Sequence, residues 1–154
     1  MAPAPAAEAL IIGECGVCDE QGPRDPDACM VPISYASAWA DEGIKSPPPR
    51  QICGYFDMGF IDGVHADLWR SSAVIVGMHP DQATEPIVDA ALRLNKPFAV
   101  VPCCVFPDAF PERALDGAPV RSYAQFLDYL RAKDPGIETA YLPFQGRSRV
   151  LYKR

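Results

Sequence analysis

The chain has 154 residues, of which 49% are hydrophobic and 22% charged, a composition typical of a folded protein that is long enough to bury a core. Its net charge of −6 argues against general attraction to the phosphate backbone of nucleic acids. No apolar run approaches the ~20 residues of a membrane span, and the N-terminus lacks the basic and apolar segments of a signal peptide. We therefore predict no membrane association, an intracellular location (cytoplasmic or nuclear) and reduced thiols for the six cysteines.

The predicted domain organisation is simple. We expect a disordered N-terminus over residues 1–8 and a single α/β domain over residues 9–154. Within this domain, residues 9–63 form an irregular N-terminal part, since prolines interrupt it, and residues 64–154 form a Rossmann-like core. We find no internal repeat.

The centre of the core is a strand, a helix and a second strand within residues 72–104. Residues 73–76 and 98–101 are short apolar runs rich in β-branched residues, typical of strands covered on both faces. The helix between them is predicted to begin at Thr84 as N-cap and to end at Asn95 in a left-handed conformation. Such a unit is almost always right-handed with parallel strands.

The segments on either side of this unit are less regular. Residues 57–63 are expected to be irregular and residues 64–70 to form a short helix, while residues 105–119 predict a loop with at most one turn.

The C-terminal part begins with a capping box. Ser122 and Gln125 have the spacing that starts a helix. Residues 137–144 then alternate as a strand, and residues 149–152 return as its antiparallel partner. The predicted fold is therefore Rossmann-like α/β, with a mainly parallel sheet, helices on both faces and a C-terminal antiparallel hairpin.

Four polar side chains follow the two central strands. His79 and Asp81 come after the first strand, and Cys103 and Cys104 after the second. The carboxyl ends of parallel strands are where open α/β sheets bind ligands. These residues can contact a ligand, act as a general base (His79) or bind a metal, or else they are a turn histidine and buried thiols with structural roles only.

Metal binding is not expected at either group of cysteines. Cys103 and Cys104 are neighbours at a strand end, where successive side chains point in different directions, so one ion would require a sharp bend. The pair Cys15 and Cys18 has the spacing of half a zinc site, but the remaining candidates lack the matching spacing. We predict ordinary thiols there rather than a four-thiolate site completed by Cys29 and Cys53.

An acidic segment with interleaved aromatic residues precedes the central unit. Its members are solvated turn formers or, alternatively, the wall of a pocket: Asp57, Asp62, His65 and Asp67. The basic C-terminus comprises Arg147, Arg149, Lys153 and Arg154. It also has two interpretations, a solvated strand edge or a phosphate or nucleic-acid contact.

From about Val64 to Lys153, the chain resembles the C-terminal half of a class I S-adenosylmethionine-dependent methyltransferase. More narrowly, it is similar to a methyltransferase-like group that includes relatives of tRNA 2′-O-methyltransferases. In that group the fourth strand ends in Gly-Leu-His-x-Cys-Gly-Asp and the fifth in a Cys-Cys pair, often after proline. The matching positions here are Gly77-Met78-His79 and Pro102-Cys103-Cys104.

The resemblance implies S-adenosylmethionine as cofactor, a methyl group transferred to RNA or a small molecule, and RNA binding by the basic C-terminus. It implies His79 and Asp81 as catalytic residues. It implies the following cofactor-binding residues: Glu14, Gly16, Gly77, Met78, Pro102, Cys103 and Cys104. Glu14 and Gly16 belong to a segment that matches the family's glycine-rich loop only in part.

Two departures from the family leave the enzymatic character open. Pro80-Asp81-Gln82 replaces the x-Cys-Gly-Asp of the group, and loop-forming residues follow Cys18 where a helix should begin. The alternative is a non-catalytic Rossmann-like binding module that has lost the cofactor loop and binds a protein partner.

Overall fold

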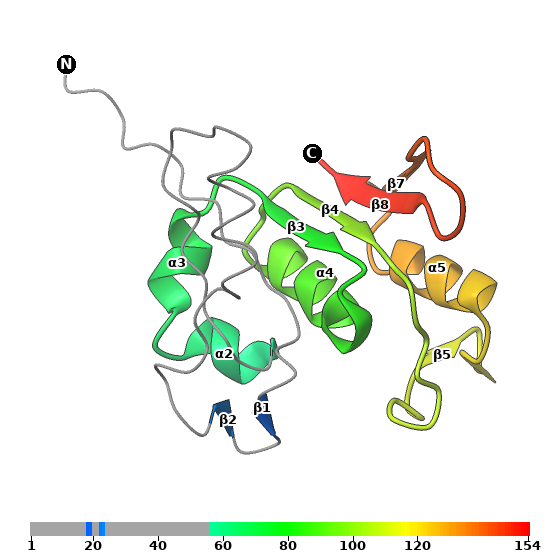
Figure 1. Cartoon of the computed structure of the whole chain (residues 1–154), viewed down its shortest axis with the longest axis horizontal. Helices are drawn as coiled ribbons and strands as arrows, with labels where there is room; N and C mark the ends of the chain where they lie inside the picture. The colour runs from blue at the N-terminus through cyan, green and yellow to red at the C-terminus, as the bar shows by residue number, and fades with distance from the viewer. Residues whose placement is uncertain (1–17, 20–21, 24–55) are drawn as a thin grey trace, which may run out of the picture. The chain divides into compact units, whose positions relative to one another are not determined.

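The computed structural model describes residues 18–19, 22–23 and 56–154 (Figure 1). The chain divides into two compact units, Met1–Tyr55 and Phe56–Arg154. In the first unit, β1 (Cys18–Asp19) and β2 (Gly22–Pro23) pair antiparallel. The predictions for residues 1–8, for the cofactor-loop residues Glu14 and Gly16 and for three thiols (Cys15, Cys29 and Cys53) lie outside the described residues.

The second unit contains a four-stranded sheet in the order β3-β4-β8-β7 (Figure 1). Its strands are β3 (Ile75–Met78), β4 (Phe98–Val101), β7 (Glu138–Tyr141) and β8 (Arg149–Lys153). β3 and β4 are parallel, whereas β8 is antiparallel to both β4 and β7. The pairing is thus mostly antiparallel in place of the predicted mainly parallel sheet, because the last strand is inserted between β4 and β7. It follows that β7 runs in the same direction as β3 and β4.

The predicted strand–helix–strand unit is confirmed as β3, α4 (Thr84–Arg93) and β4. Asn95 has the expected left-handed backbone, with φ of 49°. At Gly77, a Cβ atom would lie 2.8 Å from Ile87 Cδ1 and 3.2 Å from Val100 Cγ2. Glycine is therefore required at this position for the close approach of α4 to β3.

The two long helices lie on the same side of the sheet, where helices on both faces were expected. α5 (Tyr123–Ala132) lies beside α4 (Figure 1), and Tyr129 Oη donates a hydrogen bond to Glu85 of α4. On the other face, Val76 and Met78 are 55% and 58% exposed. β3 therefore alternates between buried and exposed residues instead of being covered on both faces, and its bounds are shifted by two residues from the predicted 73–76.

The segment before β3 is more helical than predicted. α2 (Met58–Asp62) occupies most of the supposedly irregular residues 57–63, because the Asp57 carboxylate accepts a hydrogen bond of 2.8 Å from the N–H of Phe60 and caps the helix. The predicted short helix is confirmed as α3 (Ala66–Ser71).

Residues 105–119, predicted as a loop, contain a small hairpin. β5 (Ala114–Leu115) and β6 (Ala118–Pro119) pair antiparallel around Asp116 and Gly117, whose φ values are 51° and 78°. An Asp-Gly pair is a strong hairpin signal that the sequence analysis missed. No helix in the described part of the chain is long and apolar enough to cross a membrane.

Candidate functional site

The candidate site lies at one edge of the sheet. Since β3, β4 and β7 run in the same direction, their carboxyl ends, and the turns that follow them, share this edge. The His79 N–H donates to Val101 O at 3.1 Å and thereby holds the end of β3 against the end of β4. The imidazole of His79 lies 6.3 Å from the ring of Phe144 in the turn after β7, between ring centroids. The structure thus brings three loops together here.

The turn after β3 has an unusual backbone. His79 and Asp81 both have positive φ values, 48° and 46°, on either side of Pro80. Thr84 is the first residue of α4 rather than its predicted N-cap, and its hydroxyl donates to Asp81 O at 2.8 Å. Left-handed conformations of non-glycine residues are costly and concentrate at functional sites, which is consistent with a role for this turn.

Three of the predicted site residues form one cluster. Cys103 Sγ donates to Asp81 Oδ1 at 3.0 Å, and the ligand atoms of Asp81, Cys103 and Cys104 all lie within 4.8 Å of one another. The expectation that the two thiols point in different directions is wrong. Both cysteines follow Val101, the last residue of β4, so the alternation of a pleated strand no longer applies to them.

The environment keeps both thiols protonated at neutral pH. Burial, followed by the hydrogen bond to the Asp81 carboxylate, raises the pKa of Cys103 to about 12. The Asp81 carboxylate, followed by burial, raises the pKa of Cys104. Since the thiolate is the nucleophilic form, neither residue is activated as a nucleophile.

We expect Cys103 to resist alkylation by iodoacetamide at pH 8 in the folded, chelator-treated protein and to react quickly after unfolding. Its raised pKa also implies that stability from the neutral thiol is fully present below pH 9 and is lost as the pH rises from about 9 toward 12. In Asp81→Asn the pKa should fall and alkylation should accelerate, although burial remains. Peptide mass spectrometry measures the rates, and rapid labelling of folded wild-type Cys103 at pH 8 would contradict this assignment.

Aromatic and basic side chains lie at the same edge of the sheet as the cluster. The Arg147 guanidinium lies 4.4 Å from the ring centroid of Tyr123, and that of Arg149 lies 5.3 Å from the ring centroid of Tyr141. Tyr123 Oη is buried without a hydrogen-bond partner in the described part of the chain. Burial raises the pKa of Tyr123, the charges of Arg147 and Arg149 lower it, and the charge of Cys103 raises it.

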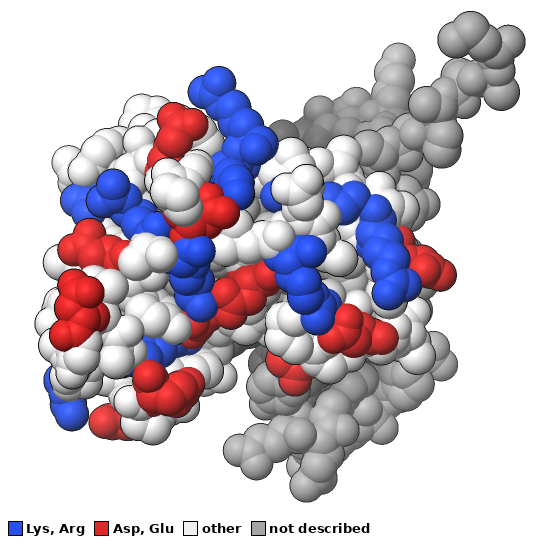
Figure 2. All heavy atoms as spheres, turned by 180° about the vertical axis from the view of Figure 1, so that it is seen from behind, with Lys and Arg blue, Asp and Glu red and all other residues white. Residues whose placement is uncertain are grey.

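The basic C-terminus does not form one patch. Arg149 pairs with Tyr141 at the site edge, whereas Lys153 pairs with Phe98 at the opposite end of the sheet. Arg149 and Lys153 are four positions apart on the same strand, which corresponds to a separation of about 14 Å. Lys153 is also neutralised by Asp134 at 2.7 Å. On the face shown in Figure 2, acidic and basic side chains lie next to one another, so no single sign dominates that face.

The acidic residues before β3 have structural roles. Asp57 caps α2, Asp62 accepts two hydrogen bonds from Arg93 at 2.7 and 2.9 Å, and Asp67 lies 3.6 Å from Arg70. The ring of His65 lies 4.7 Å from that of Phe60, between centroids. These contacts agree with turn and helix formation rather than with a pocket wall.

A buried ionic cluster was not predicted. Arg113, which is 2% exposed, binds the Glu85 carboxylate through Nε at 2.5 Å and the carbonyl of Val105 through a second nitrogen at 2.7 Å. Burial alone would raise the pKa of Glu85, but hydrogen bonds from Lys133, Tyr129 and Arg113 outweigh it and lower the pKa. The residues come from three separate segments, and no local pattern identifies them as partners.

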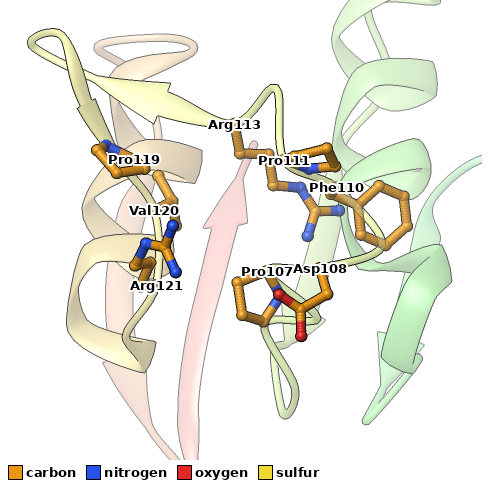
Figure 3. Close-up of a pocket in the computed structure, with 8 residues that line it drawn as sticks. All are labelled: Pro107, Asp108, Phe110, Pro111, Arg113, Pro119, Val120 and Arg121. Carbon is orange, nitrogen blue, oxygen red and sulfur yellow. The ribbon is translucent and has the colours of Figure 1, made fainter.

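Arg113 also borders a shallow pocket between residues 107 and 121. Figure 3 shows Pro107, Asp108, Phe110 and Pro111 on one side of this pocket, and Pro119, Val120 and Arg121 on the other. Three of its eight lining residues are prolines and three are charged, and the guanidinium of Arg113 is already paired with Glu85. The pocket shares no residue with the cluster at the strand ends.

The structure therefore unites Asp81, Cys103 and Cys104, and it places His79 at the same edge. Gly77 is explained by the packing of α4, Met78 is exposed on the open face of the sheet, and Pro102 is buried. No family model matches the chain, and no curated protein or solved structure is significantly similar to it.

Proposed function

We propose that the chain is a methyltransferase-like protein with a Rossmann-like core, which binds S-adenosylmethionine at the edge formed by the carboxyl ends of β3 and β4. The observation that carries the proposal is the parallel β3–α4–β4 unit, with His79 and Asp81 after one strand and Cys103 after the other. Ligands of open α/β sheets bind at this type of edge.

The remaining strands support the same interpretation. The resemblance calls for a strand, a helix, a strand, a helix and a closing antiparallel hairpin, and the observed order from β3 to β8 has these elements. β7 runs with β3 and β4, so it adds a third carboxyl end to the edge.

The side chains at the edge suit the parts of an adenosyl group. Phe144, 44% exposed, offers a planar surface for a base, and the Asp81 carboxylate can accept hydrogen bonds from hydroxyl groups. The cofactor supplies an electrophilic methyl group when it is bound. His79 is exposed and can accept a proton from an attacking hydroxyl or amine, while Asp81 fixes the turn that carries it.

An RNA acceptor agrees with part of the surface. Arg147 and Arg149 lie at the site edge, each over a tyrosine ring, and neither has an ion-pair partner among the described residues. Aromatic rings and arginines side by side bind bases and phosphates of single-stranded RNA. A small-molecule acceptor would need His79 but neither of these arginines.

Calorimetry and thermal unfolding with S-adenosylmethionine and S-adenosylhomocysteine test cofactor binding. A ligand at a hundred times its dissociation constant stabilises the folded protein by about 2.7 kcal/mol, so a clear rise in Tm is expected. His79→Ala should retain binding and lose methyl transfer, whereas His65→Ala, which alters the chain's other histidine, should retain both.

Absence of heat and of any Tm shift at millimolar ligand would reject a working cofactor site. In that event the second candidate, a non-catalytic binding module, becomes the better explanation. A specific observation favours this candidate: the pocket at residues 107–121 does not include the strand-end cluster, and the Asp81 carboxylate is already bound to Cys103. A stoichiometric protein partner retained by His79→Ala would support the module.

A further inference from the structure

The strand-end cluster has the donor atoms of a metal site. Two thiol sulfurs and one carboxylate oxygen, from the turns after two neighbouring strands, lie within 4.8 Å of one another. Cys103 is buried and Asp81 is half-buried, whereas Cys104 is the most solvent-accessible of the three ligands. We propose that Asp81, Cys103 and Cys104 bind a zinc ion, with water or a ligand atom in the fourth position.

The distances fit a tetrahedral ion. Zinc binds thiolate sulfur at about 2.3 Å and carboxylate oxygen at about 2.0–2.2 Å, so ligand atoms around it are separated by roughly 3.5–3.8 Å. The cluster is therefore within about 1 Å of the required spacing. Small side-chain rotations are enough to close this difference. Two strand ends already fix the backbone, because His79 N–H is bound to Val101 O.

The donor set selects the ion. Two thiolates with a carboxylate suit zinc better than copper(I), which prefers sulfur alone, and better than magnesium or calcium, which prefer oxygen alone. Binding replaces the proton between Cys103 Sγ and Asp81 Oδ1, and the thiol proton of Cys104, by metal–ligand bonds. Two protons are released to solvent and both sulfurs become thiolates.

A buried hydroxyl provides an independent indication of a missing group. Tyr123 Oη is buried and has no hydrogen-bond partner among the described residues, and the charge of Cys103 acts on it. Leaving such a group unpaired costs about 1–3 kcal/mol. A water molecule in the fourth coordination position, or a zinc-bound sulfur, would accept this hydrogen bond. Ligand atoms of metals are commonly held by such outer hydrogen bonds.

The test uses the full chain purified without chelator. Elemental analysis should find zinc bound to the wild type, and after its removal cobalt(II) should give a thiolate-to-cobalt charge-transfer band. Cys104→Ser and Asp81→Asn should weaken zinc binding by more than about 100-fold, because even outer-shell partners of metal ligands are worth 10–100-fold. The control is Cys15→Ser/Cys18→Ser, which removes the other candidate thiol pair and should retain the band.

Several results would overturn the proposal. These are a wild type with neither zinc nor a cobalt band, zinc retained at wild-type affinity by both Cys104→Ser and Asp81→Asn, and a band lost only in the control. Circular dichroism identifies variants that fail to fold, and the two ligand variants alter half-buried positions of different chemistry, so at least one is expected to fold. The zinc proposal shares Asp81 and Cys103 with the proposed cofactor site, but the two can fail separately, since the cobalt spectrum reports metal binding and calorimetry reports cofactor binding.

Discussion

Arg113→Ala is expected to lower the free energy of unfolding by about 3–5 kcal/mol, the range measured when one partner of a buried ion pair is removed. Arg113 is 2% exposed and links the 105–120 segment to Glu85 of α4. Its guanidinium also lies over the rings of Phe110 and Phe126, 3.7 and 4.8 Å from their centroids. The substitution removes all of these contacts and leaves the Glu85 carboxylate with fewer partners.

Arg131→Ala is the matched control. Arg131 lies 3.8 Å from Asp128 on the exposed side of α5, and both side chains are more than half exposed, so its loss should change the free energy by less than about 1 kcal/mol. Urea denaturation followed by circular dichroism measures both variants. Equal effects of the two substitutions would show that the buried cluster does not stabilise the fold.

Phe98→Ala is expected to cost about 3–5 kcal/mol of unfolding free energy, because it leaves a cavity in the core. Phe98 is 2% exposed and begins β4, where it lies between Ile75 of β3 and Lys153 of β8 in the register of the sheet. The loss should therefore weaken the central strand pair on which the candidate site depends.

Phe144→Ala is the matched control for Phe98→Ala, since Phe144 is 44% exposed in the turn after β7. It should change stability by less than about 1 kcal/mol. Thermal and urea unfolding of both variants give the difference, and a small effect of Phe98→Ala would mean that β4 is not part of the cooperative core.

The parts of the fold that were predicted correctly depend on local signals. The apolar run of β4, the left-handed Asn95 and the capping box of Ser122 and Gln125 each involve residues close in sequence. Asp57 and the Asp116-Gly117 pair were local signals too, a helix cap and a hairpin turn, and they were missed because both lie in segments judged irregular as a whole.

The strand order could not be predicted from such signals. Nothing local in Arg149–Lys153 distinguishes a strand at the edge of the sheet from one in its interior, although Val150 and Leu151 are buried on the two faces of β8. Likewise Arg113 and Glu85 are separated by 28 residues, and their pairing results from tertiary packing of the segment that carries Arg113.

The candidate site was predicted in composition but not in geometry. The handedness of the strand–helix–strand unit correctly placed the residues after β3 and β4 at one edge. β4 ends at Val101 as predicted, so the error was to apply the alternation of a strand to Cys103 and Cys104, which follow its end.

The interior position of β8 has a consequence for how the sheet assembles. β7 touches the sheet only through β8, and β8 must find β4, whose paired residues are about fifty positions earlier in the sequence. The β7–β8 hairpin closes a short turn and can form in microseconds, whereas the β4–β8 contact has to close a long loop first. Docking of the preformed hairpin onto the β3–α4–β4 unit would then be the slow step of folding, so that the edge carrying His79 and Cys103 becomes complete last.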